Sequence, residues 1–269
     1  YNIIISVVLP TMTQSLLKEK IMLLHPTLEK LTTLRFTGMT AALDEQMQMD
    51  SLDDMGFEER LGLLLDREIA VRQTRRMNTR LRKARLRQDS CIEDIDFRHP
   101  RGLDKSLVMR LAGCDWIKAH NNLIITGPTG VGKTYLACAF GQKACREGFN
   151  TLYLRMSKLF EDLSLSKGDG RYLKLLSSLA KADLLVLDDY GLEQLGREQR
   201  HDLLEILEDR HGLKSTLVTS QLSVQNWHEQ IGDPTLADAI PDRLVHSAHK
   251  IKLNGESMRK KKGLKTKPA

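Results

Sequence analysis

The stretch "LIITGPTGVGKT", residues 123–134, decides the fold of this 269-residue chain. Its first half is an apolar run typical of a buried strand, and its second half matches the pattern G-x-x-x-x-G-K-[ST] in full. The glycines allow successive backbone N–H groups to face phosphate oxygens, and a helix that begins at Lys133 adds the positive end of its dipole. We therefore predict a phosphate-binding loop between a strand and a helix.

The side chains of this loop predict separate roles at a bound nucleotide. The Lys133 ammonium is expected to reach the β- and γ-phosphates, and the Thr134 hydroxyl is expected to ligate Mg²⁺. A glycine-rich turn can also be purely structural, but the lysine, the threonine and both flanks together favour a nucleotide site. The predicted nucleotide-binding residues are Gly127, Pro128, Thr129, Gly130, Val131, Gly132, Lys133 and Thr134.

A second motif, "LLVLDDYG" at residues 184–191, places two carboxylates directly after an apolar strand. Asp188 would end the strand where a carboxylate can hold the Mg²⁺ shell. Asp189 would follow at the point where an attacking water needs a base within hydrogen-bond reach. The alternative is a solvated turn after a strand.

Strands and helices alternate from residue 121 onward. Helices are predicted over 133–147 and 197–210, each ended by a glycine. Because nearly all-apolar strands that alternate with helices are typical of a parallel sheet covered on both faces, we predict an α/β fold with five parallel strands. The predicted strands are residues 123–127, 151–155, 184–188, 216–220 and 249–253.

Residues 22–88 have apolar side chains at helical spacing and end in a dense basic block, "RQTRRMNTRLRKARLRQ", residues 72–88. The block predicts a helix with too narrow an apolar seam to be deeply buried. It has no aromatic residue on which single-stranded bases could stack, so it suits the phosphates of duplex DNA. A solvated helix face or a site for an acidic partner remains the alternative. The predicted DNA contacts are Arg72, Arg75, Arg76, Arg80, Arg82, Lys83, Arg85 and Arg87.

Four segments together carry a resemblance to a known family: "GPTGVGKT", "LLVLDDYG", "TLVTSQL" and "DRLVHSAHKIKLNGESMR". The chain resembles the AAA+ ATPases that contain the IstB-like transposition helper proteins and the DnaC-type helicase loaders. "LLHPTLEKLTTLRFTGMTAALDEQ" and "GDPTLADAIPDRLVH" resemble the IstB-like branch more closely, and the resemblance covers about residues 22–262. It implies an AAA+ core that uses ATP and Mg²⁺ and assembles into a ring or spiral of identical subunits.

The resemblance also implies roles for three further residues. Gln221 falls at the polar sensor position after a strand, and Arg243 falls at the arginine finger that a neighbouring subunit offers. Arg259 would contact phosphate within its own subunit. The chain departs from many relatives, which have Asp-Glu at 188–189 and Asn at 221. A surface salt bridge for Arg243 and a strand-capping role for Gln221 are the alternatives.

Composition and charge give the remaining expectations, on the class of partner, the cysteines and the localisation. The formal charge of +6 agrees with a polyanion partner. The four cysteines form no C-x-x-C pair, which predicts reduced thiols and no structural metal, and no segment resembles a signal peptide, so a cytoplasmic protein without a membrane partner is expected. Met12 and Met22 are candidate start residues, and an edge strand is the alternative for the first residues. The predicted organisation is a non-native or disordered extension (1–21), a helical DNA-binding or oligomerisation domain (22–90), a linker (91–120), the ATPase domain (121–256) and a basic tail (257–269).

These observations predict an ATP-dependent transposition helper that assembles on double-stranded DNA and recruits or activates the transposase of the same element. A helicase loader that acts on single-stranded DNA is the main alternative. A small-molecule kinase and a nucleotide switch that does not hydrolyse ATP are further alternatives.

Overall fold

A computed structural model describes residues 26–49 and 55–258, which divide into two units between Arg76 and Met77. The described part of the first unit is helix and turn. It contains a helix at residues 26–33, α2 (Thr37–Met47) and the first part of α3 (Phe57–Ala84). Whether this unit is an independent helical domain stays a prediction.

In the first unit, α2 packs closely against α3 because Gly38 has no side chain. A Cβ at Gly38 would lie 2.6 Å from the Glu68 Cα atom. The buried Glu68 carboxylate accepts hydrogen bonds from the Gly38 and Met39 amides at 2.7 and 3.2 Å, and from Arg72 Nε at 2.6 Å. A carboxylate at this place satisfies free amides of the first turn of α2 and complements the helix dipole.

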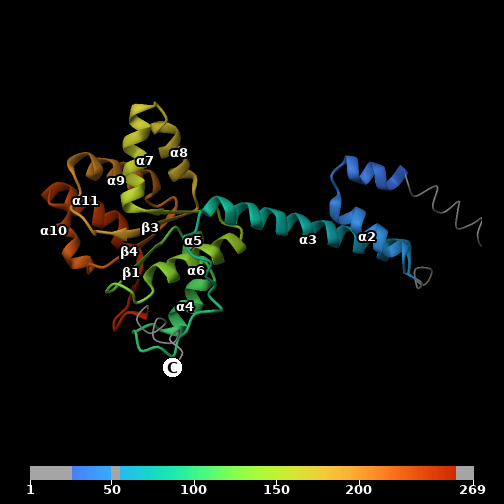
Figure 1. Ribbon diagram of the computed structural model, residues 1–269, viewed down its shortest axis with the longest axis horizontal. Helices are drawn as coiled ribbons and strands as arrows, with labels where there is room; N and C mark the ends of the chain where they lie inside the picture. The colour runs from blue at the N-terminus through green and yellow to red at the C-terminus, as the bar shows by residue number, and fades with distance from the viewer. Residues whose placement is uncertain (1–25, 50–54, 259–269) are drawn as a thin grey trace, which may run out of the picture. The chain divides into compact units, whose positions relative to one another are not determined.

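The second unit contains a five-stranded parallel sheet of order β2-β3-β4-β1-β5 (Figure 1). All five predicted strands are confirmed to within two residues at either end, and the predicted α/β fold class is confirmed. β1, β3 and β4 lie inside the sheet and are buried over almost their whole length, which accounts for their apolar sequences. The strands are β1 (Asn122–Thr126), β2 (Thr151–Arg155), β3 (Leu184–Tyr190), β4 (Ser215–Ser220) and β5 (Ala248–Lys252).

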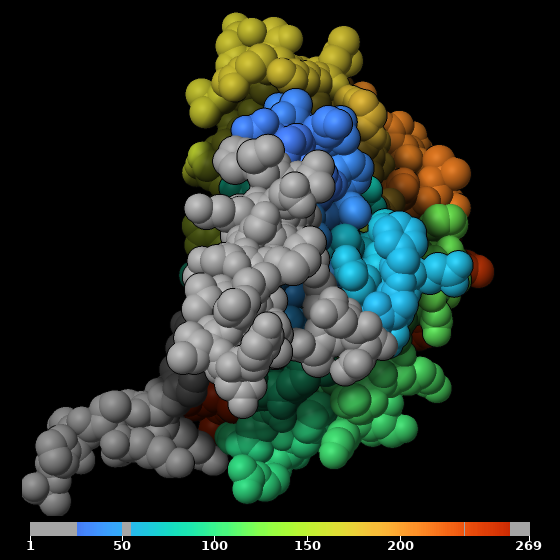
Figure 2. All heavy atoms as spheres, turned by 90° about the vertical axis from the view of Figure 1, so that its right-hand side faces the viewer, coloured from blue at the N-terminus to red at the C-terminus, as the bar shows by residue number. Residues whose placement is uncertain are grey.

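Two hydrophobic clusters cover the two faces of this sheet. The first cluster contains Leu111, Trp116 and Phe140, and the second contains Leu163 and Trp227. Figures 1 and 2 both place α7 at one end of the unit and α4 at the other. The helices of the first face are α4 (Lys105–Ala112), α5 (Asp115–Lys118) and α6 (Lys133–Arg146); those of the second are α7 (Met156–Gly168), α8 (Tyr172–Lys181), α9 (Arg197–Arg210), α10 (Trp227–Ile231), which follows the short 3₁₀ helix η2 (Val224–Asn226), and α11 (Pro234–Val245).

The segment that leads into the sheet differs from its prediction. The predicted helix through residue 88 ends at Ala84, because Arg85 has a left-handed backbone with φ of 53°. Leu86 then packs against the first cluster. The predicted linker, residues 91–120, includes α4 and α5 and buries Ile92 and Ile95 in the same cluster, so these residues are part of the core rather than a free connection.

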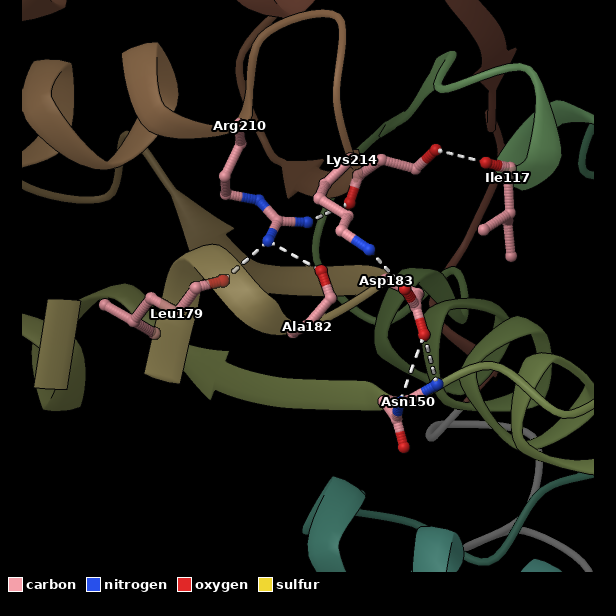
Figure 3. Close-up of polar contacts among 8 residues, drawn as sticks. Ile117, Asn150, Leu179, Ala182, Asp183, Arg210 and Lys214 are labelled. Atoms are coloured by element: carbon pink, nitrogen blue, oxygen red, sulfur yellow. Dashed lines mark hydrogen bonds and ion pairs between the residues drawn. The ribbon is translucent and has the colours of Figure 1, made fainter. Parts of the chain in front are cut away.

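Arg210 fixes the amino-terminal ends of β3 and β4 from the last turn of α9 (Figure 3). Its buried guanidinium donates to the Leu179 and Ala182 carbonyls at 2.6 and 2.8 Å and also to the Ser215 carbonyl. Burial lowers the pKa of Arg210 to about 10. Because buried carbonyls need donors, this one side chain holds α8, β3 and β4 together.

Several predictions concern residues outside the described ranges: the extension 1–21 with Met12 and Met22, and residues 259–269 of the basic tail, which include Arg259. Among the residues that the structure describes, none of the helices is long and apolar enough to cross a membrane.

Candidate nucleotide-binding site

The loop between β1 and α6 is shaped by glycines and by the chain that follows β5. Gly127 has φ of 150°, and a Cβ there would lie 2.4 Å from the Leu253 carbonyl oxygen. Gly130 has φ of 85°, and a Cβ there would lie 2.1 Å from Ser257 Oγ. The Met258 amide donates to the Gly130 carbonyl at 2.9 Å. Only glycine fits these two positions, so the loop has the turn that exposes its amides to phosphate.

Lys133 and Thr134 open α6 at the positions that their motif predicts. The Lys133 ammonium donates to the Gly127 and Pro128 carbonyls at 2.7 and 2.9 Å, inside the curve of the loop. The Thr134 hydroxyl lies 3.1 and 3.0 Å from the two carboxylate oxygens of Asp188. The two motifs, 54 residues apart, therefore meet at one point, where hydroxyl and carboxylate oxygens form a donor set that Mg²⁺ prefers.

Asp188 is fully buried and accepts two further hydroxyl hydrogen bonds from the neighbouring strands. Tyr153 Oη of β2 donates to Asp188 Oδ2 at 2.6 Å, and Thr219 Oγ1 of β4 donates to Asp188 Oδ1 at 2.5 Å. Burial, and then the hydrogen bond and charge of Asp188, raise the pKa of Tyr153, so its phenol keeps its proton. The sequence did not single out either hydroxyl, although Thr219 stands in the "TLVTSQL" segment.

Asp189 adopts a strained backbone. Its φ is 64°, and the pairing of β3 with β4 is irregular between Leu187 and Tyr190. The Asp189 amide donates to Thr219 Oγ1 at 3.0 Å, so Thr219 contacts both acidic residues. Burial, and then the charge of Asp188, raise the pKa of Asp189. Left-handed backbone at a residue other than glycine is uncommon, and such strain concentrates at functional sites.

A cavity of about 420 Å³ opens beside these groups. Its wall includes Lys133, Thr134 and Asp189, and this volume lies within the range of small-molecule sites. The other wall comes from the segment that was predicted to be a linker, with Asp94 and Arg101. A nucleotide in the loop would therefore contact residues that precede β1 in the sequence as well as residues that follow it.

Arg101 lines the cavity and also holds the loop. The residue is 2% exposed, and its guanidinium donates through Nη1 to the Val131 carbonyl at 2.9 Å and through Nη2 to the Asp96 carbonyl at 3.3 Å. Burial lowers the pKa of Arg101. The motif pattern gives no sign of this residue, because Arg101 stands 26 residues before the first loop glycine and reaches it only through the fold.

Gln221 lies beside the loop. The Thr129 hydroxyl donates to Gln221 Oε1 at 2.7 Å, and both residues line the cavity. Among β4 and the residues after it, the polar side chain that contacts Asp188 is Thr219. The sensor role of Gln221 stays a prediction.

Arg243 lies at the other end of β1. The Nδ2 atom of the Asn122 side chain, at the start of β1, donates to the Arg243 carbonyl at 2.9 Å, whereas the loop follows the end of that strand. The Arg243 guanidinium donates to the Ala239 carbonyl at 2.8 Å and pairs with Glu208 at 2.7 Å. Arg243 therefore does not line the cavity of its own chain, and within the chain it makes the surface salt bridge that was its alternative interpretation.

The basic block is less uniform than predicted. Four of its side chains contact the protein: Arg72 pairs with Glu68, Arg75 donates to Thr37, Arg80 donates to the Cys145 carbonyl, and Arg87 lies 4.0 Å from Asp188 and 3.9 Å from Asp189. Arg80 is partly buried, and Arg87 is exposed but faces the two acidic residues; the role of the block as a DNA contact stays a prediction. The remaining four are exposed and form no ion pair with a described residue: Arg76, Arg82, Lys83 and Arg85.

Comparison with known proteins agrees with this site. The sequence matches the family described as IstB-like ATP binding protein over residues 29–266, so the chain belongs to that family. It is 55% identical to the insertion sequence ATP-binding protein y4pL of Sinorhizobium fredii over 89% of this chain and 98% of that protein. It is 49% identical to the ATP-binding protein of insertion sequence IS1162 of Pseudomonas fluorescens, over 75% of this chain and 87% of that protein. The chain is thus an ATP-binding protein of the insertion-sequence type.

Solved structures agree on the fold. The crystal structure of DnaI has a TM-score of 0.53 and 24% identity, over 65% of this chain and 93% of that chain. AMPPCP-bound DnaA from Aquifex aeolicus has a TM-score of 0.53 and 16% identity, over 69% and 57%. At these identities the likeness concerns the fold alone, and the fold is that of an AAA+ P-loop protein.

Proposed function

We propose that this chain hydrolyses ATP with Mg²⁺ and that nucleotide turnover controls its assembly on duplex DNA, where it recruits or activates the transposase of its own insertion sequence. The observation that carries the proposal is the meeting of Thr134 with both oxygens of Asp188 beside Lys133. The insertion-sequence relatives support the link to transposition.

The residues present fit a metal-assisted hydrolysis. Thr134 and Asp188 would hold Mg²⁺, which neutralises charge on the phosphates when it is bound. Lys133 would move from the loop carbonyls to the phosphates. Asp189, with a pKa raised by burial and by Asp188, would orient a water molecule and accept its proton.

The position of Arg243 supports assembly of several copies. β1 has five residues and rises roughly 16 Å at about 3.3 Å per residue, which separates Arg243 from the loop of its own chain. An arginine there can act on a terminal phosphate only in another copy. A head-to-tail ring or spiral would place it so, and it would make hydrolysis depend on assembly.

Exposed cations support the DNA part of the proposal. Arg82, Lys83 and Arg85 carry three positive charges within four residues, and none is neutralised by a described acidic residue. Contacts of this kind attract phosphates without reading bases, so the predicted binding is sensitive to salt and indifferent to sequence.

The test is phosphate release from ATP by the purified chain, alone, with plasmid duplex and with single-stranded DNA. We expect stimulation by duplex DNA, loss of turnover in Asp189→Asn and loss of ATP binding in Lys133→Ala. Asn is a suitable replacement because it adopts the left-handed backbone of residue 189 readily. A rate of ATP turnover that is the same with and without DNA would contradict the proposal. Stronger stimulation of turnover by single-stranded than by duplex DNA would favour a helicase loader.

A second measurement addresses the transposase. We expect the transposase of the same element to bind the complex of this chain with ATP and duplex DNA, and to bind less in Lys133→Ala. Equal binding of the transposase by the wild type and by Lys133→Ala would show that recruitment does not depend on the nucleotide.

A further inference from the structure

Arg87 belongs to the basic block by sequence and to the nucleotide site by position. Its guanidinium Nη1 atom lies 4.0 Å from Asp188 Oδ2 and 3.9 Å from Asp189 Oδ2. The side chain is 42% exposed, and it also interacts with the Tyr153 side chain. Nothing in the motifs assigns a role to it.

The chain around Arg87 is anchored on both sides, whereas its side chain is partly exposed. Ala84, before it, ends α3 and is fully buried, and Leu86 packs against the first hydrophobic cluster. The next residue, Gln88, lines the nucleotide cavity. A turn of the Arg87 side chain alone is therefore enough to break its contact with the acidic pair.

A guanidinium and a divalent cation compete for the same carboxylates. Asp188 contacts Thr134, Asp189 follows it, and Arg87 supplies positive charge to both of them. A cation that binds there must do so beside this charge, which lowers its affinity. Movement of the Arg87 side chain away from Asp188 and Asp189 would raise the affinity of the site for the cation.

Phosphates of DNA are the natural competitor for Arg87. Arg85 is exposed and lies two residues before it, and Arg82 and Lys83 precede it on the last turn of α3. A duplex bound to these three residues would bring a dense row of phosphates near the Arg87 side chain. A guanidinium binds phosphate oxygens as well as carboxylate oxygens, so the DNA phosphates and the acidic pair would compete for the Arg87 side chain.

We propose that Arg87 is a positioning residue that couples DNA to the metal site: it competes with Mg²⁺ for Asp188 and Asp189, and duplex DNA draws it away. DNA binding then raises the affinity of the site for Mg²⁺ and ATP. The DNA part of this inference rests on the proposed function, whereas the competition at the acidic pair does not.

The first experiment needs neither DNA nor hydrolysis. Binding of a fluorescent, non-hydrolysable ATP analogue is measured while Mg²⁺ is titrated, for the wild type and for Arg87→Ala, Arg87→Lys and Arg85→Ala. We expect the half-saturating Mg²⁺ concentration to fall about two- to five-fold in Arg87→Ala, a range typical of a half-exposed ion pair. The Lys variant keeps the charge and Arg85→Ala keeps the pair, so both should resemble the wild type. An unchanged or higher Mg²⁺ requirement in Arg87→Ala would overturn the inference.

The second experiment repeats the titration with a short duplex. DNA should lower the Mg²⁺ requirement of the wild type and should have no further effect on Arg87→Ala. Arg85→Ala should need more DNA for the same shift. An equal DNA-dependent shift in Arg87→Ala and the wild type would overturn the coupling. If the wild type bound no DNA, the proposed function would fail, and the first titration would still decide whether Arg87 competes with the metal.

Discussion

At the scale of single residues, Asp188 shows how this protein holds a carboxylate inside a sheet. The Arg87 guanidinium approaches it to 4.0 Å. The hydroxyl groups of Tyr153 and Thr219 donate hydrogen bonds to its two oxygens. A hydroxyl donates one hydrogen bond without adding positive charge. It therefore orients the carboxylate and does not weaken the attraction between the carboxylate and a metal cation.

Removal of the Tyr153 hydroxyl should therefore weaken the metal site without damage to the core. In Tyr153→Phe the ring stays in the sheet, but Asp188 loses a hydrogen bond that fixes its orientation. We expect ATP turnover to fall about 10-fold, the lower end of the range for lost partners of metal ligands, with an increased Mg²⁺ requirement.

The matched control is Tyr190→Phe, because the buried Tyr190 hydroxyl has no hydrogen-bond partner among the described residues. Turnover in this variant should equal that of the wild type. If both variants lost activity equally, the effect would come from core packing, and the role given to Tyr153 would be wrong.

Residues at this site differ in how far the sequence predicts them. Lys133, Thr134 and Asp188 are predictable because their roles depend on local backbone geometry, which the short motifs encode. Tyr153 and Arg101 are not, because they reach the site through strand order and through the packing of a segment without a motif. Sequence spacing carries no information on such contacts.

At the scale of helices and strands, the strands are more predictable than the end of α3. The apolar runs of β3 and β4 could be buried in only one way, inside a covered parallel sheet. By contrast, the residues after Ala84 have ordinary helix propensity, and nothing local stops the helix there. The chain turns at Arg85 and Leu86 packs beside Gly141 in the core, so the end of α3 goes with a tertiary contact.

Glu68 gives a pH dependence to the contact between α2 and α3. The hydrogen bond from Arg72, together with the Met39 and Gly38 amides, outweighs burial and lowers the pKa of Glu68 from its ordinary value of 4.5. A depressed folded-state pKa means that the stabilisation is present above pH 4.5 and is lost as the pH falls through the lower folded value. Residue 36, before α2, makes no side-chain cap, so Glu68 is the described side chain that caps this end.

We therefore expect hydrogen exchange at the Gly38 and Met39 amides to accelerate as the pH falls below about 4.5, after correction for intrinsic rates. In Glu68→Gln the amides should exchange roughly 10-fold faster at neutral pH, since a neutral acceptor binds more weakly than a charged one, and the acid dependence should disappear. Hydrogen exchange with mass spectrometry resolves these peptides, and peptides from α9 serve as the internal control. A wild type with no acid dependence at α2 would contradict the role of Glu68.

At the scale of the whole molecule, the residues to which the proposed function gives a role in ATP hydrolysis lie at two separate places. Lys133, Thr134 and Asp188 meet at the carboxyl ends of the strands, whereas Arg243 lies at the opposite end of β1 and is held there by Glu208. One chain cannot bring the two together, because the sheet between them is a rigid core. Two chains in head-to-tail contact can bring them together, and this arrangement can be tested by complementation between two inactive variants.

Two inactive variants should restore activity to each other when they are mixed. Asp188→Asn lacks the metal ligand but keeps Arg243, and Arg243→Ala keeps the metal ligand but lacks the arginine. In an equal mixture that reassembles at random, about a quarter of head-to-tail interfaces combine an intact site with an intact arginine. We expect each variant alone to turn over ATP only slowly and the mixture to recover activity in that proportion. The control replaces the second protein with the double variant Asp188→Asn/Arg243→Ala, which should restore nothing. If subunits exchange, as affinity tags on each variant can verify, and activity still does not return, then Arg243 does not act on a neighbouring site, and the salt bridge with Glu208 is its whole role.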